Sequence, residues 1–84
     1  MESYIRTLLY EKGISLEHSF LIPSDDIFGN HIVPVEVVVE FISSLNKETQ
    51  LHIKWTLVKI DFNNGDILSY LEYICKGMVN LKFK

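Results

Sequence analysis

Apolar residues recur with helical spacing near both ends of the chain, and this pattern predicts helices at residues 2–12 and 66–77. Gly13 follows the first segment as a stop. Asp66 starts the second as a cap or first-turn acid, and Gly77 lies near its end. The apolar positions that share a face are Ile5, Leu8 and Leu9 in the first segment, and Ile67, Leu71, Ile74 and Met78 in the second.

Residues 34–45 carry two conflicting signals. Three consecutive valines are typical of a strand, whereas Pro34 cannot donate a hydrogen bond to a sheet and suits the first position of a helix. Glu36 and Glu40 suit the early turns of a helix. The apolar positions at helical spacing are Val35, Val38, Ile42 and Leu45. We therefore predict a helix here.

Residues 51–62 fit two interpretations. Apolar and polar residues alternate until Leu57 and Val58 break the alternation, as in a strand with a bulge. At about 100° per residue, the same positions form two stripes on a helix. One stripe comprises Leu51, Trp55, Val58 and Phe62, and the other comprises Ile53, Leu57 and Ile60. Asn46 and Glu48 form a helix start and favour the helix, and two apolar stripes predict packing between two neighbours.

Residues 14–33 are irregular, and we predict a small β-ribbon within them. Residues 18–22 and 30–33 are its strands, and the proline and aspartates between them are typical of a turn. The tail at 79–84 alternates like an edge strand, which either pairs beside 18–22 or frays. The predicted fold is mostly α, with four short helices and a two-stranded ribbon in the N-terminal half. A strand at 51–62 would make it a small α+β fold.

The composition predicts one small globular domain with apolar surface to spare. The chain has 84 residues, of which 48% are hydrophobic and 12% aromatic. A chain this short has little interior in which to hide that surface, so we expect a protein partner or self-association. Tyrosine and tryptophan are common interface anchors. The candidate anchors are Tyr10, Phe28, Trp55, Tyr70 and Tyr73.

Charge is distributed unevenly around a net charge of −3. Residues 1–44 carry a net charge of −5, and residues 45–84 carry +2. The candidate acidic surface comprises Glu11, Glu17, Asp25, Asp26, Glu36 and Glu40. An acidic chain with a single arginine disfavours nucleic-acid binding. The opposite signs either complement each other within the fold or across an interface, or belong to ordinary solvated faces.

No pattern of catalytic or metal-binding residues stands out. Cys75 is the only cysteine, which excludes an intrachain disulfide, and we expect a buried, inert thiol. His18 and His31, with Asp25 or Asp26, form a loose metal-site candidate if the ribbon brings them together. No phosphate-binding glycine loop is present, and no apolar run is long enough to span a membrane. We expect no cofactor and no small-molecule substrate.

These observations favour a non-enzymatic cytoplasmic protein that binds other proteins, as a homodimer or as an inhibitor or adaptor. Small acidic chains of this type are common in phages and mobile elements, and such an origin is a hypothesis here. The acidic half would then occupy a basic groove of a host protein. The alternatives are a nucleic-acid-associated accessory protein and a small metal-dependent enzyme that uses His18 and His31.

Overall fold

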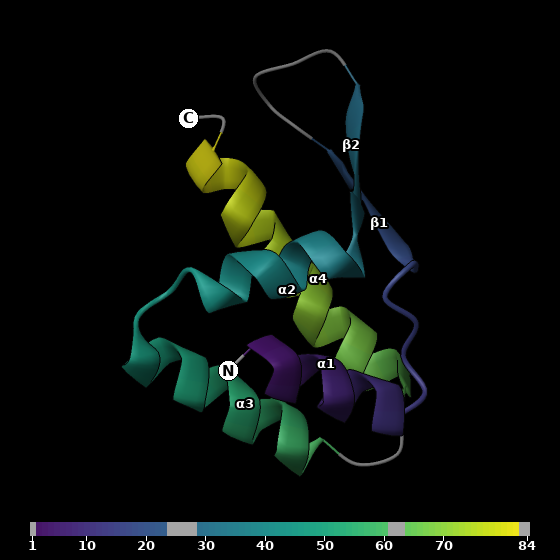
Figure 1. The fold of residues 1–84 in the computed structure, drawn as a ribbon. Helices are drawn as coiled ribbons and strands as arrows, with labels where there is room; N and C mark the ends of the chain where they lie inside the picture. Colours follow the sequence, from purple (N-terminus) through teal and green to yellow (C-terminus); the bar gives the residue numbers. More distant parts are fainter. Residues whose placement is uncertain (1, 24–28, 61–63, 83–84) are drawn as a thin grey trace.

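The computed structural model describes residues 2–23, 29–60 and 64–82 and contains four helices and a two-stranded antiparallel sheet (Figure 1). The elements in chain order are α1 (Glu2–Glu11), β1 (Ser19–Pro23), β2 (Asn30–Pro34), α2 (Val35–Ser43), α3 (Lys47–Lys59) and α4 (Asn64–Lys82). The predicted fold, mostly α with a β-ribbon in the N-terminal half, is confirmed. Residues 51–59 are helical, so the bulged strand is the wrong alternative for them.

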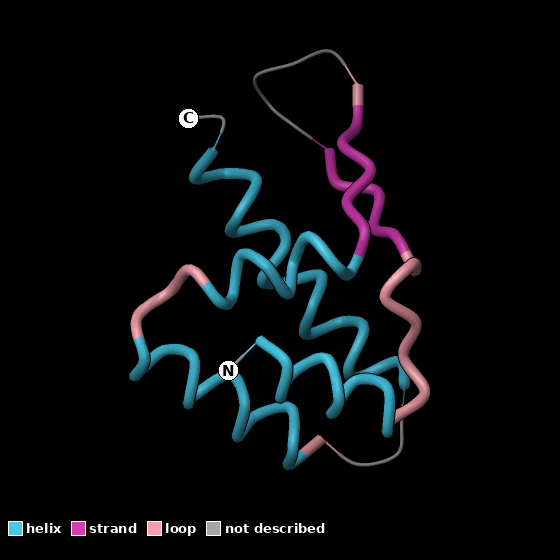
Figure 2. Tube along the Cα trace, viewed as in Figure 1, coloured by secondary structure: helices cyan, strands magenta, loops and turns pink. Residues whose placement is uncertain are grey.

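Helix α2 is the centre of the molecule (Figures 1 and 2). Helices α1 and α4 pack against it, α3 packs against α1, and the ribbon touches α4 through β1 and α2 through β2. All of these elements contribute to one hydrophobic core. Its completely buried side chains are Ile5, Leu9, Val35, Val38, Val39, Ile42, Leu57, Ile67, Leu71 and Cys75.

Helix α1 ends where the sequence predicts. Gly13 has a φ of 79°, which favours glycine, and its N–H donates to the Tyr10 carbonyl at 3.0 Å. The N–H of Ile14 donates to the Leu9 carbonyl at 2.9 Å. These two bonds form a Schellman motif, which ends the helix and turns buried Ile14 back towards the core.

The ribbon carries the chain from α1 into α2. Leu21 lies opposite Ile32 in its register, and both side chains point away from the core. At its base, the N–H of Val35 donates to the His18 carbonyl at 2.7 Å and caps the start of α2. Pro34 is the N-cap and the last residue of β2, not the first helical residue that we predict, because its ψ of 151° is extended.

A buried glutamine organises the turn between α2 and α3. The Gln50 Nε2 donates to the Ser43 carbonyl at 3.2 Å and to the Leu45 carbonyl at 2.6 Å. It therefore satisfies carbonyls that the end of α2 leaves without a helical partner. The predicted cap of α3 is confirmed, because the Asn46 Oδ1 accepts a hydrogen bond from the Thr49 N–H at 2.8 Å.

Helix α4 is longer than the sequence predicts at both ends. It begins at Asn64 rather than Asp66 and continues through Gly77 to Lys82. The strand predicted from residue 79 is therefore wrong as far as residue 82, and residues 83–84 lie outside the described part of the chain. Met78 and Val79 explain the longer C-terminal end, because both are buried and extend the core-facing side of the helix by a turn.

Candidate functional site

Only one of the two apolar stripes of α3 is buried. Ile53 is 5% exposed and Leu57 is fully buried on the side that faces the core. On the other side, the exposed fractions are 43% for Leu51, 53% for Trp55 and 37% for Val58. The predicted packing between two neighbours is therefore wrong, since α3 covers the core from one side. Phe62, the fourth member of the outer stripe, lies outside the described residues.

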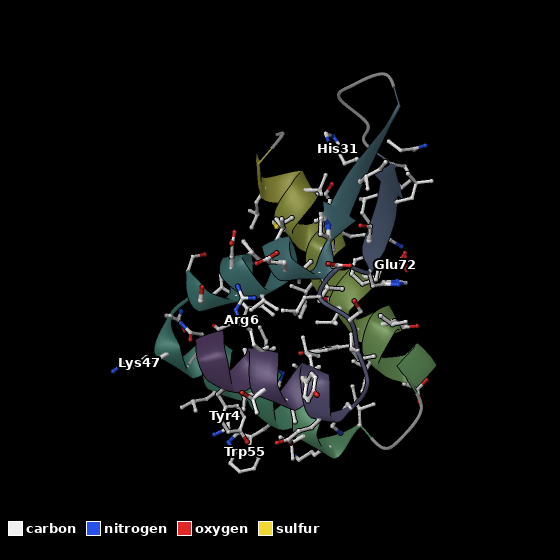
Figure 3. All side chains as sticks on the ribbon, turned by 45° about the vertical axis from the view of Figure 1, so that its right-hand side comes forward. Tyr4, Arg6, His31, Lys47, Trp55 and Glu72 are labelled. Atoms are coloured by element: carbon white, nitrogen blue, oxygen red, sulfur yellow. The ribbon has the colours of Figure 1, made fainter. Side chains whose placement is uncertain are left out.

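The outer stripe continues onto α1 through a stacked lysine. The Nζ of Lys54 lies 4.2 Å from the centre of the Tyr4 ring and 5.2 Å from that of the Trp55 ring. Figure 3 shows the two aromatic side chains close together below α1 and α3. Attraction between the ammonium and the ring faces holds this arrangement. We call the surface formed by Tyr4, Leu51, Lys54, Trp55 and Val58 the α1–α3 face.

A second lysine, Lys12, joins the end of α1 to the end of α3. The Nζ of Lys12, just after α1, donates to the Ile60 carbonyl at 2.5 Å and lies 3.4 Å from the Val58 carbonyl. These carbonyls lie at the C-terminal end of α3, where a helix lacks its own donors and where a positive charge is favoured. Hence, the α1–α3 face lies on two helices whose relative position is held by direct contact.

The predicted anchor Tyr73 lies on a different surface. Its side chain is 73% exposed on α4 and lines an open hollow of about 440 Å³ together with residues of α2, α3 and the turn between them. Apolar side chains dominate the lining, namely Phe41, Leu45, Ile53, Ile74 and Leu81. Tyr70 is half-buried and packs against the core, so it supports α4 from within.

Tyr10 belongs to a third region. Its side chain is 83% exposed and lines a hollow of about 520 Å³ with Arg6 and Glu17. Phe28 lies outside the described residues. The structure thus distributes the four anchors that it describes over separate surfaces, and of these four only Trp55 belongs to the α1–α3 face.

The candidate acidic surface is interrupted by a base. The Arg6 guanidinium lies 3.5 Å from the Glu36 carboxylate, so it offsets that charge. Glu17 borders the same hollow as Arg6, and Glu40 lies one helical turn beyond Glu36 on α2. Glu11 is exposed at the end of α1. Asp25 and Asp26 lie outside the described residues.

The ribbon keeps the two candidate metal ligands apart. His31 pairs with Ile22 towards the tip, whereas His18 lies just before Ser19 at the base. Four residues of a strand separate these levels by about 13 Å. The His18 ring packs edge-on against Phe20, with ring centres 5.3 Å apart. The described segments contain no group of three side chains that could bind a metal ion.

Cys75 is a structural residue of α4. It is fully buried, as predicted, and burial raises the pKa of its thiol to about 11, with a further contribution from the Glu72 carboxylate. A thiol with this pKa is protonated at neutral pH and is a poor nucleophile.

The raised pKa of Cys75 predicts a loss of stability in alkali. An unfolded cysteine has a pKa of about 8.5, so between this value and about 11 the thiol ionises preferentially in the unfolded chain. The stabilisation that the protonated thiol gives the folded state is complete below about pH 8.5 and is lost as the pH rises towards about 11. In a Cys75→Ala variant, the free energy of unfolding measured with urea should fall over this range by about 2–3 kcal/mol less than in the original protein. If the free energy of unfolding falls equally with pH in both proteins, the loss does not come from Cys75.

The sequence does not predict that Tyr4 and Lys54 meet beside Trp55. Tyr4 is one of several tyrosines, and Lys54 is one of several lysines, so neither has a distinguishing local signal.

Across the described ranges, no helix is both long enough and apolar enough to span a membrane. No protein-family model, curated protein or solved structure matches the chain, so its function must be argued from its own surfaces.

Proposed function

We propose that this chain is a non-enzymatic, cytoplasmic protein that acts by binding protein, either another protein or a second copy of itself, through its α1–α3 face. The observation that carries the proposal is the exposed apolar stripe of Leu51, Trp55 and Val58 beside Tyr4. Exposing one large apolar side chain is ordinary, but a contiguous group of them on one surface is typical of an interaction site.

The content and rigidity of the face support this proposal. Trp55 and Tyr4 supply aromatic area, and tryptophan and tyrosine are enriched among the residues that dominate binding energies at interfaces. Lys12 and Lys54 bridge α1 and α3, so the side chains are arranged before a partner arrives. A prearranged surface loses less conformational freedom on binding.

Site-specific photo-crosslinking in cells of the native host tests this proposal. With p-benzoylphenylalanine in place of Leu51, irradiation should produce one discrete adduct, either with another protein or with a second copy of the chain. The matched control places the same group at Ser69, which is exposed on α4. A Trp55→Ala substitution should abolish the Leu51 adduct, because it removes the largest apolar side chain of the stripe.

The proposal is judged by comparing the adducts formed at the Leu51 and Ser69 sites. An adduct from the Leu51 site alone, lost in the Trp55→Ala variant, supports the proposal. Adducts of equal yield from both sites, or none from the Leu51 site, would show that the α1–α3 face is not the binding surface.

A further inference from the structure

The outer stripe of α3 has the spacing of a seam between two helices. Successive members of Leu51, Trp55 and Val58 are four and then three residues apart, as are the core positions of paired helices. At a rise of about 1.5 Å per residue, the stripe is about 10 Å long, or two helical turns. A second helix with its own apolar stripe therefore fits this exposed surface.

The border of this stripe is mostly basic. Helix α3 carries Lys47, Lys54 and Lys59 against one acid, Glu48, although the whole chain has a net charge of −3. At about 100° per residue, Lys54 and Lys59 lie on opposite sides of the stripe, and Lys47 precedes it by one turn. Lys47 and Lys54 would therefore line one edge of a helix placed on the stripe, whereas Lys59 shares the other edge with Glu48.

Helix α1 does not reverse this charge. Among the side chains that the structure describes, its exposed acid is Glu11, two turns beyond Tyr4. Its base, Arg6, is turned towards Glu36 of α2 rather than towards the stripe. Lys12 follows directly and lies against the end of α3. The α1–α3 face is thus apolar along its middle, and lysines outnumber acids at its rim, where Glu48 is the acid of α3.

Building on the function proposed above, we infer that the partner segment is an acidic amphipathic helix of a different protein. Its apolar stripe would cover Leu51, Trp55 and Val58, and acidic side chains beside that stripe would face Lys54 and Lys59. Opposite charges across an interface speed association and select the partner, in addition to the affinity that apolar burial supplies.

A second copy of α3 is a poorer occupant than an acidic helix. In an antiparallel pair centred on Trp55, the Lys54 side chains of the two copies would meet on one edge. Lys59 would meet His52 on the other edge. In a parallel pair, Lys54 of each copy would lie beside Lys59 of the other. Like charges placed together weaken helix pairing, whereas acidic side chains would remove this repulsion.

Two designed peptides test the inference directly. Both are alanine-rich helices of about 20 residues with leucines at seam spacing, and they differ only in flanking residues, glutamate in one and lysine in the other. Trp55 is the only tryptophan of the chain, so its fluorescence reports binding at the α1–α3 face. The glutamate peptide should bind at least about tenfold more tightly than the lysine peptide. Its advantage should shrink between about 0.05 M and about 0.5 M salt.

Charge-reversal variants provide the controls. A Lys54→Glu, Lys59→Glu double variant should prefer the lysine peptide. Lys76→Glu is the matched control, because Lys76 is an exposed lysine on α4, away from the stripe, and this variant should keep the original preference. The melting temperature of each variant, followed by circular dichroism, shows that the fold is intact.

The outcomes separate this inference from the proposed function. Equal binding of both peptides, or binding of neither, overturns the acidic helix and leaves the crosslinking result to decide whether the face binds protein. A Trp55 signal that changes with protein concentration alone overturns it in favour of self-association. Tighter binding of a single-stranded oligonucleotide than of the glutamate peptide overturns it in favour of nucleic acid, which also favours stacked aromatics and lysines.

Discussion

Replacing Leu57 with alanine should lower the free energy of unfolding by about 2–5 kcal/mol. Leu57 is fully buried on the core side of α3, so the substitution removes apolar contacts and leaves a cavity. Urea denaturation followed by far-UV circular dichroism measures the change. A loss of this size would remove a large part of the stability of a chain this small.

Val58 supplies the control one residue further along the same helix. It is 37% exposed on the outer stripe, so the Val58→Ala substitution should cost less than about 1 kcal/mol. Equal losses at positions 57 and 58 would mean that both sides of α3 are covered in the folded chain. The contrast therefore tests the exposure of the stripe independently of any binding partner.

The Gln50→Leu substitution should cost about 1–3 kcal/mol, because it leaves the Ser43 and Leu45 carbonyls without their donor. Gln50 is only 7% exposed, so water cannot easily replace its amide. Chemical denaturation at neutral pH measures the effect.

Gln50→Glu separates the hydrogen bonds from the packing. Glutamate has nearly the same shape, but its ionised carboxylate only accepts hydrogen bonds and would face two carbonyl oxygens. This variant should be destabilised at least as much as the leucine variant near neutral pH and should lose less at a pH low enough to protonate it. A Gln50→Glu protein as stable as the original would show that the amide donors contribute little.

The sequence predicts a helix well where the spacing of its apolar residues and the residues typical of helix ends indicate the same boundaries. The glycine stop after α1 and the asparagine cap of α3 both depend on a few adjacent residues, and both are confirmed. The tail is different, because Val79 and Leu81 alternate with polar residues as in a strand, yet Val79 is buried by the core. Tertiary packing overrides a short alternating pattern in this case.

The α1–α3 face is only partly predictable for a related reason. The two stripes of α3 have similar apolar content, and the sequence alone does not show which one lacks a neighbour. Trp55 is predictable as an anchor from its type, whereas Tyr4 joins the face only because α1 packs beside α3. About fifty residues separate Tyr4 from Lys54, so their contact is a product of the whole fold.

The contact of Lys12 with the C-terminal end of α3 has a consequence for how the chain folds. Lys12 directly follows α1, but its acceptors, the Val58 and Ile60 carbonyls, lie 46 and 48 residues later in the sequence. During synthesis, the contact between α1 and α3 therefore cannot form until most of the chain has been made. Contacts of such long sequence separation slow folding. Until they form, the apolar sides of α1 and α3 are both open to other molecules in the cell.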